Sequence, residues 1–273
     1  MRLTKYHGLG NDFLVALWHD QQDGAPLSPD PETARALCAR HTGIGADGLI
    51  YGLPPGGDEA DVHMVLLNSD GSEAEISGNG IRCLAQAVLR RDGRSEGDVL
   101  VETVRGLRHL RTVRGDVDGE LWTQVDMGVP APGPTLTPEA QSITAVERET
   151  VDIGNPHLVL LVEDPGAVDL ESVGPTLERS FAGGINVHFV SVRSASPGET
   201  AGEVDLRVWE RGVGVTNACG SGAVAAAVAT RGWGRTGPHV TVRMPGGVAT
   251  VDLDGPAALL TGPSTFVAEV VVP

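Results

Sequence analysis

The 273-residue sequence is poor in several residue types, and each scarcity narrows what the protein can do. There is one lysine, Lys5, against 19 arginines. An enzyme that uses pyridoxal phosphate needs a lysine deep in its fold for the Schiff base. Because Lys5 lies in a strand-like N-terminal segment, we expect any amino-acid chemistry of this protein to proceed without a cofactor.

Cysteines and long apolar runs are also scarce. The three cysteines, Cys38, Cys83 and Cys219, are too few and too far apart for a disulfide framework, which is typical of a reducing compartment. No basic N-terminal segment followed by an apolar run occurs, and no stretch approaches the roughly 20 apolar residues of a membrane span. These absences predict a cytoplasmic protein with no membrane contact.

Positive charge is in deficit, since the formal net charge is −16. Nucleic acid requires a basic surface, so we expect no nucleic-acid partner. The eight histidines show no ligand spacing with acids or cysteines, and no metal is expected. The stretch GIGADG (43–48) matches the pattern G-x-G-x-x-G, but a helical segment precedes it and an apolar strand follows it. That order is the reverse of a dinucleotide-binding turn.

The chain contains an internal repeat. Four segments recur in the same order with offsets between 141 and 144 residues: GNDFLVAL (10–17) with GNPHLVLL (154–161), DVHMVLLNSDG (61–71) with EVDLRVWERGV (203–213), SGNGIRCLAQAV (77–88) with CGSGAVAAAV (219–228), and TVRGLRHL (103–110) with RMPGGVATV (243–251). This alignment places Ser77 opposite Cys219 and Asn68 opposite Glu210. A repeat of this length predicts two copies of one structural unit.

Each copy has the same pattern of elements. An alternating strand leads into a glycine-rich loop, an alanine-rich helix and further strands, and a second helix is expected at 31–41 and at 171–180. The sequence therefore predicts an α+β fold of two pseudo-symmetric halves, 1–125 and 126–273, with the last strand allowed to cross back. The segment PAPGPTLTPE (130–139) is interpreted as a connector without helix or strand.

Ser77 and Cys219 stand directly before the two alanine-rich helices. The first backbone N–H groups of a helix have no intrahelical partner, so they bind a carboxylate and favour a thiolate over a thiol. If the two helix starts meet at the interface of the halves, one reactive group lies on each face of a bound acid. Inverting a carbon next to a carboxylate needs that arrangement, because one group removes a proton and the other returns one.

Most single residues in these motifs also have a structural explanation. Cys38 and Cys83 lie in apolar helical runs and are interpreted as small buried side chains, whereas Cys219 lies in a polar, glycine-rich loop. His157 fits either a satisfied core histidine or a site residue. Beside the Cys219 loop, Glu210 and Arg211 are either a surface ion pair or a clamp for a substrate carboxylate.

At this point the motifs resemble a known family. HGLGNDF (7–13), HTGIGADG (41–48), NSDGSEAEISGNGIRC (68–83), GNPH (154–157), NVHFV (186–190) and ERGVGVTNACGSGA (210–223) are similar to those of the diaminopimelate epimerases, and the resemblance covers essentially the whole chain. It implies two similar α/β halves, each with strands wrapped around a central helix. It also implies a cofactor-independent isomerase that converts LL-2,6-diaminopimelate to the meso form, commonly as a homodimer.

The resemblance also implies roles for individual residues. Cys219 matches one catalytic cysteine, with His157 and Glu210 in support. The positions that match substrate-binding residues are Asn11, Asn68, Gly78, Asn79, Asn155, Asn186, Glu210, Arg211, Gly220 and Ser221. The sequence departs from the family at Val215, where many members have glutamate, and at Ser77, where the family has its second catalytic cysteine.

Three explanations of Ser77 stay open on the sequence. The serine is a natural variant whose hydroxyl, or a water beside it, relays protons with His157 or Glu75; it is an engineered substitution; or the enzyme performs a one-base reaction such as an elimination. The alternatives to diaminopimelate epimerisation are a related amino-acid racemase or dehydratase on the same scaffold, and an amino-acid-binding protein without catalysis.

Overall fold

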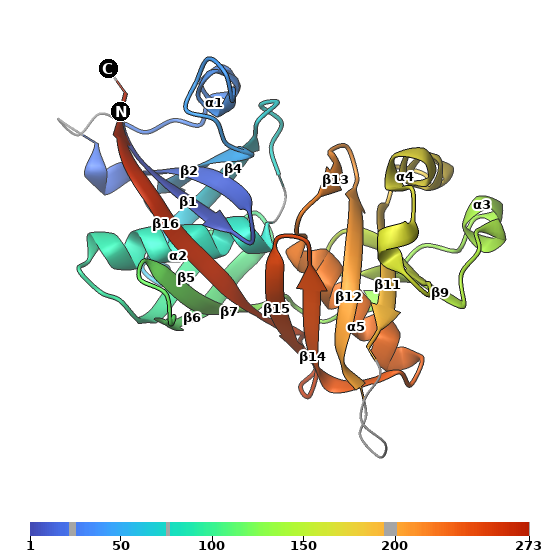
Figure 1. Cartoon of the computed structure of the whole chain (residues 1–273). Coiled ribbons are helices and arrows are strands. Elements are labelled where there is room, and N and C mark those ends of the chain that lie inside the picture. The colour runs from blue at the N-terminus through green and yellow to red at the C-terminus, as the bar shows by residue number, and fades with distance from the viewer. Residues whose placement is uncertain (22–25, 75–76, 194–200, 273) are drawn as a thin grey trace. The chain divides into compact units, whose positions relative to one another are not determined.

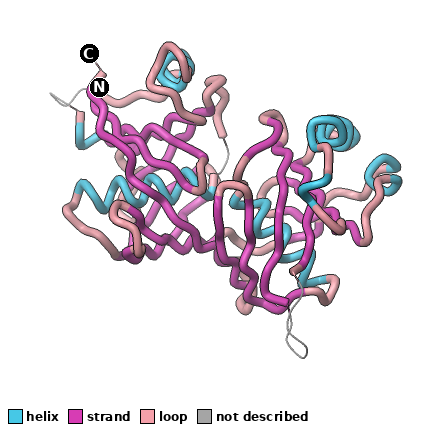
Figure 2. The backbone as a smooth tube through the Cα atoms, in the orientation of Figure 1, coloured by secondary structure: helices cyan, strands magenta, loops and turns pink. Residues whose placement is uncertain are grey.

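The structure, a computed structural model, describes residues 1–21, 26–74, 77–193 and 201–272. Its internal contacts divide the chain into two compact units. Unit 1 comprises Met1–Asp126 and Thr261–Pro273, and unit 2 comprises Met127–Leu260. Each unit mixes helices and strands, which confirms the predicted α+β class, and in each of them strands surround one long helix (Figure 2).

Unit 1 is a closed β-barrel. Its elements are β1 (Arg2–Gly8), β2 (Asn11–Leu17), η1 (Trp18–Asp20), α1 (Pro31–Cys38), β3 (Gly48–Leu53), β4 (Val62–Asn68), α2 (Gly78–Arg91), β5 (Gly97–Thr103), β6 (Gly106–Arg114), β7 (Glu120–Asp126) and most of β16 (Leu259–Val271). The strands pair in the order β1-β2-β3-β4-β5-β6-β7-β16, and β16 pairs back with β1. The C-terminal strand therefore closes the barrel that the N-terminal strand opens (Figure 1).

Helix α2 fills this barrel. Every residue from Gly78 to Leu89 is buried, so the helix has no solvent face, which is the pattern of a core helix. It begins where the Ser77 hydroxyl caps its first turn and ends near Gly93, whose φ of 69° suits glycine. Three of its buried side chains are polar: Asn79, Arg82, and Gln86, which donates to the Gly119 carbonyl at 2.7 Å.

Helix α1 covers the outside of β3 and β4 over a second core cluster. Its start is set by Asp30, whose carboxylate accepts from two first-turn amides, and by Pro31 at the first helical position. We predicted a helix over 31–41, but α1 ends at Cys38. The Leu37 carbonyl accepts hydrogen bonds from the amides of Ile44 and Gly45, so the chain turns back at this point.

Unit 2 repeats much of this plan in an open sheet. Its elements are β8 (Ala131–Pro132), α3 (Pro138–Ser142), β9 (Glu147–Asp152), β10 (Pro156–Leu161), η3 (Pro165–Ala167), α4 (Leu170–Ser180), β11 (Asn186–Val192), β12 (Ala201–Glu210), β13 (Gly214–Thr216), α5 (Gly220–Gly232), β14 (Thr236–Met244) and β15 (Gly247–Asp252). The strands pair in the order β15-β14-β12-β11-β10-β9-β8, with β13 on β12. Helix α5 contacts six of these strands, β9 to β12, β14 and β15.

The pairing pattern confirms the internal repeat. From β1 to β6, successive strands pair alternately antiparallel and parallel, beginning and ending with an antiparallel pair. Successive pairs of β9, β10, β11, β12, β14 and β15 follow the same alternation. Register agrees as well, since Phe13 pairs with Gly48 and His157 with Asn186. His157 therefore corresponds to Phe13. On the next strand of each unit, two residues after Asn186 and Gly48, His188 corresponds to Ile50.

The predicted connector at 130–139 contains structure that we did not expect. Ala131 and Pro132 form β8, which pairs with β9, and Pro138 is the first residue of α3, which Thr137 caps. Proline is tolerated at both places because an edge strand and a first helical turn do not need its missing N–H. Helices α3 and α4 pack together beside a core cluster built on Leu158, Phe189 and their neighbours.

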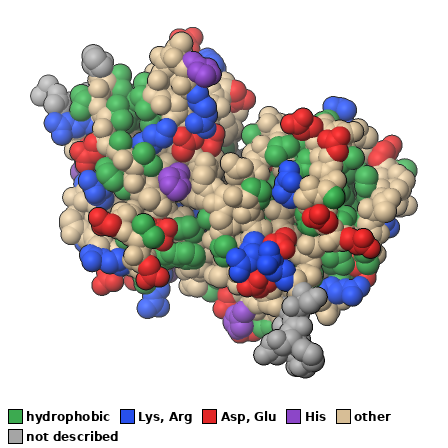
Figure 3. Space-filling model, viewed as in Figure 1, with side chains coloured by type: hydrophobic (Ala, Val, Ile, Leu, Met, Phe, Trp, Pro, Cys, Tyr) green, Lys and Arg blue, Asp and Glu red, His purple; other side chains and the backbone are tan. Residues whose placement is uncertain are grey.

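The helices and the surface add two observations. No helix in the described part of the chain is long and apolar enough to cross a membrane. On the face that Figure 3 shows, acidic side chains lie among the basic ones.

Candidate active site

In unit 1 the predicted residues gather at one end of the barrel. Asn11 begins β2, and Asn68 ends β4 and pairs with Gly48 at the start of the strand between them. Ser77 stands at the start of α2 in extended backbone, with φ −138° and ψ 113°, and is half-buried. Its hydroxyl oxygen accepts a hydrogen bond from the Gly80 amide at 3.0 Å, as expected for a helix N-cap.

A chain of hydrogen bonds holds the two asparagines of this end. Asn79 Nδ2 donates to Asn11 Oδ1 at 3.3 Å, and Asn11 Nδ2 donates to Asp47 Oδ2 at 2.7 Å. From the core, Arg82 Nη2 donates to Asn79 Oδ1 at 2.5 Å, and Arg82 Nε donates to the Pro263 carbonyl at 3.3 Å. Burial of this guanidinium lowers the pKa of Arg82 to about 10. Sequence reasoning assigned no role to Arg82 or Asp47.

Charged side chains continue this chain to the surface. Arg40 forms ion pairs with Asp47 at 2.6 Å and with Asp12 at 2.8 Å, and Lys5 contacts Asp12 at 2.8 Å. Burial opposes ionisation of Asp12, but hydrogen bonds from Arg40 and Lys5 outweigh it and lower the pKa of Asp12. The single lysine is therefore a structural cation at this end of the barrel.

Asn68 has a local partner. Its Nδ2 donates to Ser72 Oγ at 3.0 Å, and its backbone amide donates to the Ser72 carbonyl at 2.8 Å. These bonds close the turn after β4. Glu75, which we considered as a proton relay for Ser77, lies outside the described residues.

In unit 2 Cys219 occupies the place that Ser77 has in unit 1. It caps α5 with φ −132° and ψ 116°, and its sulfur accepts from the Gly222 amide at 3.3 Å and lies 3.6 Å from Ser221 Oγ. The side chain is 6% exposed. The structure thus confirms that both predicted reactive residues are helix N-caps.

The expected thiolate, however, is not favoured at Cys219. Burial is the largest influence and raises the pKa of this thiol, and the nearby carboxylate of Glu210 raises it further. Hydrogen bonds from Ser221 and Gly222 lower it by less. We expected the helix start to dominate, but the cost of desolvating a thiolate is greater here.

His157 lies beneath Asn155 in a second hydrogen-bonded chain. His157 Nε2 lies 2.9 Å from Asn155 Oδ1, and His157 Nδ1 lies 2.7 Å from His188 Nε2. Both imidazoles are fully buried. Burial, aided by His188 and Arg211, lowers the pKa of His157 far below its usual range, and burial lowers the pKa of His188 to about 3. The pair is therefore neutral near pH 7.

The remaining predicted residues of unit 2 lie where β11 begins and β12 ends. Asn186 is buried, and its amide bridges two backbone groups: Nδ2 donates to the Pro156 carbonyl at 3.0 Å and Oδ1 accepts from the Arg211 amide at 3.0 Å. Glu210 accepts from Thr216 Oγ1 at 2.5 Å. Asn186 therefore positions the Arg211 backbone.

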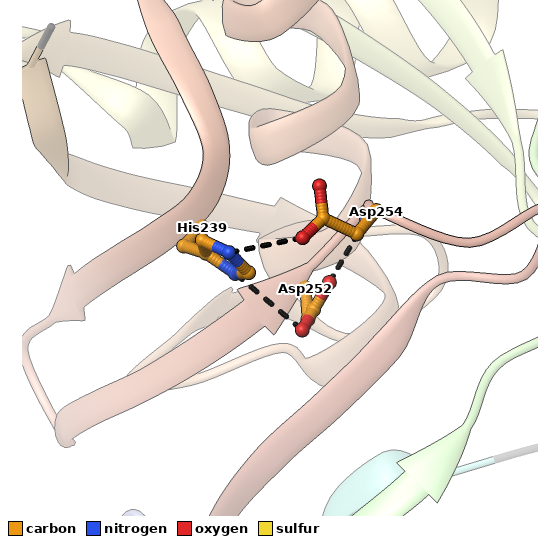
Figure 4. Close-up of side chains that lie close together, drawn as sticks. All are labelled: His239, Asp252 and Asp254. Carbon is orange, nitrogen blue, oxygen red and sulfur yellow. Dashed lines mark hydrogen bonds and ion pairs between the residues drawn. The ribbon is translucent and has the colours of Figure 1, made fainter.

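One group of side chains has the spacing of metal ligands. His239, Asp252 and Asp254 converge on the β14–β15 hairpin (Figure 4), with His239 3.4 Å from Asp252 and 3.1 Å from Asp254. Strand pairing brings them together, since His239 pairs with Asp252, so their sequence spacing carried no signal. All three are solvent-accessible and bind one another, and we assign no metal to them.

Two cavities of several hundred Å³ lie away from the predicted site residues. A cavity of about 430 Å³ in unit 2 is bordered by Arg193, Arg243 and Asp205, and one of about 610 Å³ in unit 1 is bordered by Arg90 and Arg114. Neither cavity is lined by a cysteine, a histidine or any predicted site residue. We therefore base the candidate site on the two helix N-caps, one in each unit.

Comparison with known proteins gives the family. The diaminopimelate epimerase family model matches residues 3–131 and 149–267. The diaminopimelate epimerase of Desulfitobacterium hafniense is 41% identical, with 98% of this chain and 96% of that protein aligned. That of Prochlorococcus marinus is 38% identical, with 97% and 90% aligned.

Solved structures agree on the fold. A predicted epimerase from Pseudomonas aeruginosa superposes with a TM-score of 0.71 at 17% identity, covering 99% of this chain and 98% of that one. A probable proline racemase from Agrobacterium radiobacter also gives a TM-score of 0.71 at 17% identity, covering 100% and 92%. At such low identity these likenesses concern the fold alone. By its sequence match over nearly its whole length and by its repeated architecture, the chain belongs to the diaminopimelate epimerase family.

Proposed function

We propose that this protein interconverts LL-2,6-diaminopimelate and meso-2,6-diaminopimelate, a step that supplies precursors of lysine and peptidoglycan. It acts as an isomerase without a cofactor. The observation that carries the proposal is the pair of N-caps, Ser77 and Cys219, in a chain 41% identical to a diaminopimelate epimerase. Each N-cap combines a side chain that bears a proton with the amides that bind a carboxylate.

The reaction requires two groups that act on opposite faces of one carbon. One group takes the α-proton, and the electron pair of the C–H bond is delocalised into the adjacent carboxylate. The other group returns a proton to the opposite face. In each unit the first-turn amides, those of Gly78 and Asn79 or those of Gly220 and Ser221, can bind a carboxylate, because the positive end of a helix favours negative charge.

Glu210 supports the chemistry of Cys219. Its carboxylate lies close enough to the sulfur to raise the pKa of the thiol by charge and by a hydrogen bond. Since burial keeps the thiol protonated near pH 7, Glu210 accepts the thiol proton when Cys219 must act as the base. Arg211, Asn155 and Asn186 hold the polar ends of the substrate beside this pair.

Ser77 takes the place of the second cysteine with an unchanged local geometry, since its oxygen accepts from Gly80 as the Cys219 sulfur accepts from Gly222. An alcohol is a much weaker acid than a thiol, so proton transfer on this face is slow. We therefore propose that proton transfer at Ser77 limits the rate of epimerisation. Ser77 is also the observation that favours a second candidate, a one-base reaction on an amino acid of similar charge.

Deuterium exchange tests these proposals. LL-Diaminopimelate is incubated with the enzyme in heavy water, and deuterium at the α-carbon is followed by NMR while the meso isomer is followed by chiral chromatography. We expect both signals, with exchange faster than inversion for one of the two isomers, and we expect Ser77→Cys to accelerate inversion. Full activity of Cys219→Ala together with no effect of Ser77→Cys would refute the two-base mechanism. Deuterium exchange at the α-carbon without any formation of the meso isomer would favour the one-base candidate.

We also propose that the enzyme is a cytoplasmic homodimer, which is the commonest oligomer of soluble enzymes. The three free thiols support a reducing compartment. Light scattering after size-exclusion chromatography measures the mass directly, and a mass near the 28.3 kDa of one chain would contradict the dimer.

A further inference from the structure

The buried pair His157–His188 is more polar than the fold requires at these positions. In unit 1 the corresponding residues are Phe13 and Ile50, and Ile50 packs against Gly80 of α2 as His188 packs against Gly222 of α5. The corresponding strands and helix of unit 1 thus pack around an apolar pair, Phe13 and Ile50. Two buried imidazoles carry a desolvation cost that apolar side chains avoid, so packing alone does not explain them.

Hydrogen bonding allows two arrangements of protons along the chain His188–His157–Asn155. In the first, His188 Nε2–H donates to His157 Nδ1, and His157 Nε2–H donates to Asn155 Oδ1. His188 Nδ1 then carries a lone pair. In the second arrangement every bond is reversed, the Asn155 amide is flipped, and His188 Nδ1 carries a proton.

The surroundings of His188 Nδ1 select the first arrangement. This atom is buried and has no hydrogen-bond partner among the described residues. It lies against the first turn of α5, 2.9 Å from the point that a Cβ on Gly222 would occupy. The start of a helix carries partial positive charge, which attracts a lone pair and repels an N–H. A buried N–H without an acceptor is also the more costly of the two alternatives.

We propose that His188 is a positioning residue that holds His157 in its Nε2–H tautomer and thereby turns the Asn155 amide so that Nδ2 faces the ligand as a double donor. The proposal rests on the proposed function in so far as the ligand group that Asn155 meets is a carboxylate of diaminopimelate. Both rings are neutral near pH 7, which agrees with this arrangement. A charged His188 ring would carry a proton on Nδ1, where no acceptor lies among the described residues.

The tautomers are measured first, without any substrate. Long-range ¹H–¹⁵N correlation spectra of the histidine rings at pH 7, assigned with His157→Gln and His188→Gln, should show both rings neutral with the proton on Nε2. A proton on Nδ1 of His157, or a charged ring at His188, would overturn the proposal. This result does not depend on whether the enzyme epimerises diaminopimelate.

Binding of LL-diaminopimelate is measured next by calorimetry in a matched pair of variants. His188→Ile, which introduces the residue that the first half uses, removes the donor to His157 and should raise Kd about 10-fold, roughly the value of one hydrogen bond to a charged group. His188→Gln places an amide N–H where imidazole Nε2–H was and should restore binding to within about 2-fold of wild type. The exposed His239→Gln is the control and should not change Kd.

The outcomes separate this inference from the proposed function. If wild type binds LL-diaminopimelate and His188→Ile binds it equally well, the positioning role is wrong while the substrate stands. If His188→Ile and His188→Gln lose binding to the same extent, His188 acts through packing and the tautomer role is wrong. If wild type does not bind diaminopimelate but the tautomers are as expected, the proposed function fails and the hydrogen-bonded chain stands.

Discussion

The two halves support corresponding asparagines with different chemistry. In unit 1, Asn11 is held by the carboxylate of Asp47 and, through Asn79, by the buried cation of Arg82. In unit 2, Asn155 is held by two neutral imidazoles in series. The pairing order of six strands and the capped central helix are the same in both. A shared backbone therefore fixes where the polar group lies but leaves open how it is held.

This difference extends to the reactive residues. Ser77 is half-buried, whereas Cys219 is 6% exposed and its pKa is raised by burial. A group that must exchange protons near pH 7 tolerates burial better as a thiol than as an alcohol, because the reference pKa of a thiol lies closer to neutrality.

The largest effect is expected when the halves are made alike by Cys219→Ser. With an alcohol at both N-caps neither face has an efficient proton-transfer group, so kcat for epimerisation should fall by about 10³–10⁴-fold. Substrate binding should change little, since the helix amides are kept. Product formation followed by chiral chromatography gives kcat. A loss of less than 10-fold would mean that Cys219 does not transfer the proton.

Ser77→Cys makes the halves alike by placing a cysteine at both N-caps. This change should raise kcat by about 10²-fold. The thiol would stand at the same N-cap and accept from Gly80 as Cys219 does from Gly222. The ratio of exchange to inversion in heavy water should approach the same value for both isomers. Cys38→Ser, at a buried cysteine outside the polar loops, is the control and should not raise kcat.

The charged support of unit 1 is tested by Asp47→Ala. Removing the acceptor of Asn11 Nδ2 frees that amide to rotate, so KM should rise about 10-fold while kcat changes by less than about 3-fold. Asp98→Asn, at an exposed carboxylate of β5 paired only with His109 among the contacts described, is the matched control. A fall in kcat with constant KM would place Asp47 in the chemical step.

The neutral support of unit 2 should make the protein sensitive to acid. The folded pKa of His188, about 3, lies below the unfolded value near 6.5, so between these values the unfolded chain binds more protons. The stability contributed by the neutral ring is complete above pH 6.5 and is lost as the pH falls, by up to about 1.4 kcal/mol per pH unit. Urea unfolding between pH 7 and pH 4.5 should give a shallower decline for His188→Ile than for wild type. Equal declines would contradict the buried neutral ring, and His239→Gln should behave as wild type.

Local signals in the sequence were sufficient for much of the fold. Periodicity placed the strands, glycine-rich loops before alanine-rich runs placed both helix starts, and the repeat paired Ser77 with Cys219. These features depend on neighbouring residues, so a one-dimensional pattern records them. Helix α1 was predicted three residues too long because a returning loop, rather than a stop residue, ends it.

Other features were decided only by the tertiary structure. The sequence alone established the repeat, the family motifs and the two N-caps, since each is recognised from short runs of consecutive residues. Closure of the barrel by β16, the contact of Arg82 with Pro263 and the hydrogen bond between His188 and His157 join residues far apart in the sequence. The raised pKa of Cys219 belongs with them, because desolvation depends on everything packed around the sulfur and not on the order of residues along the chain.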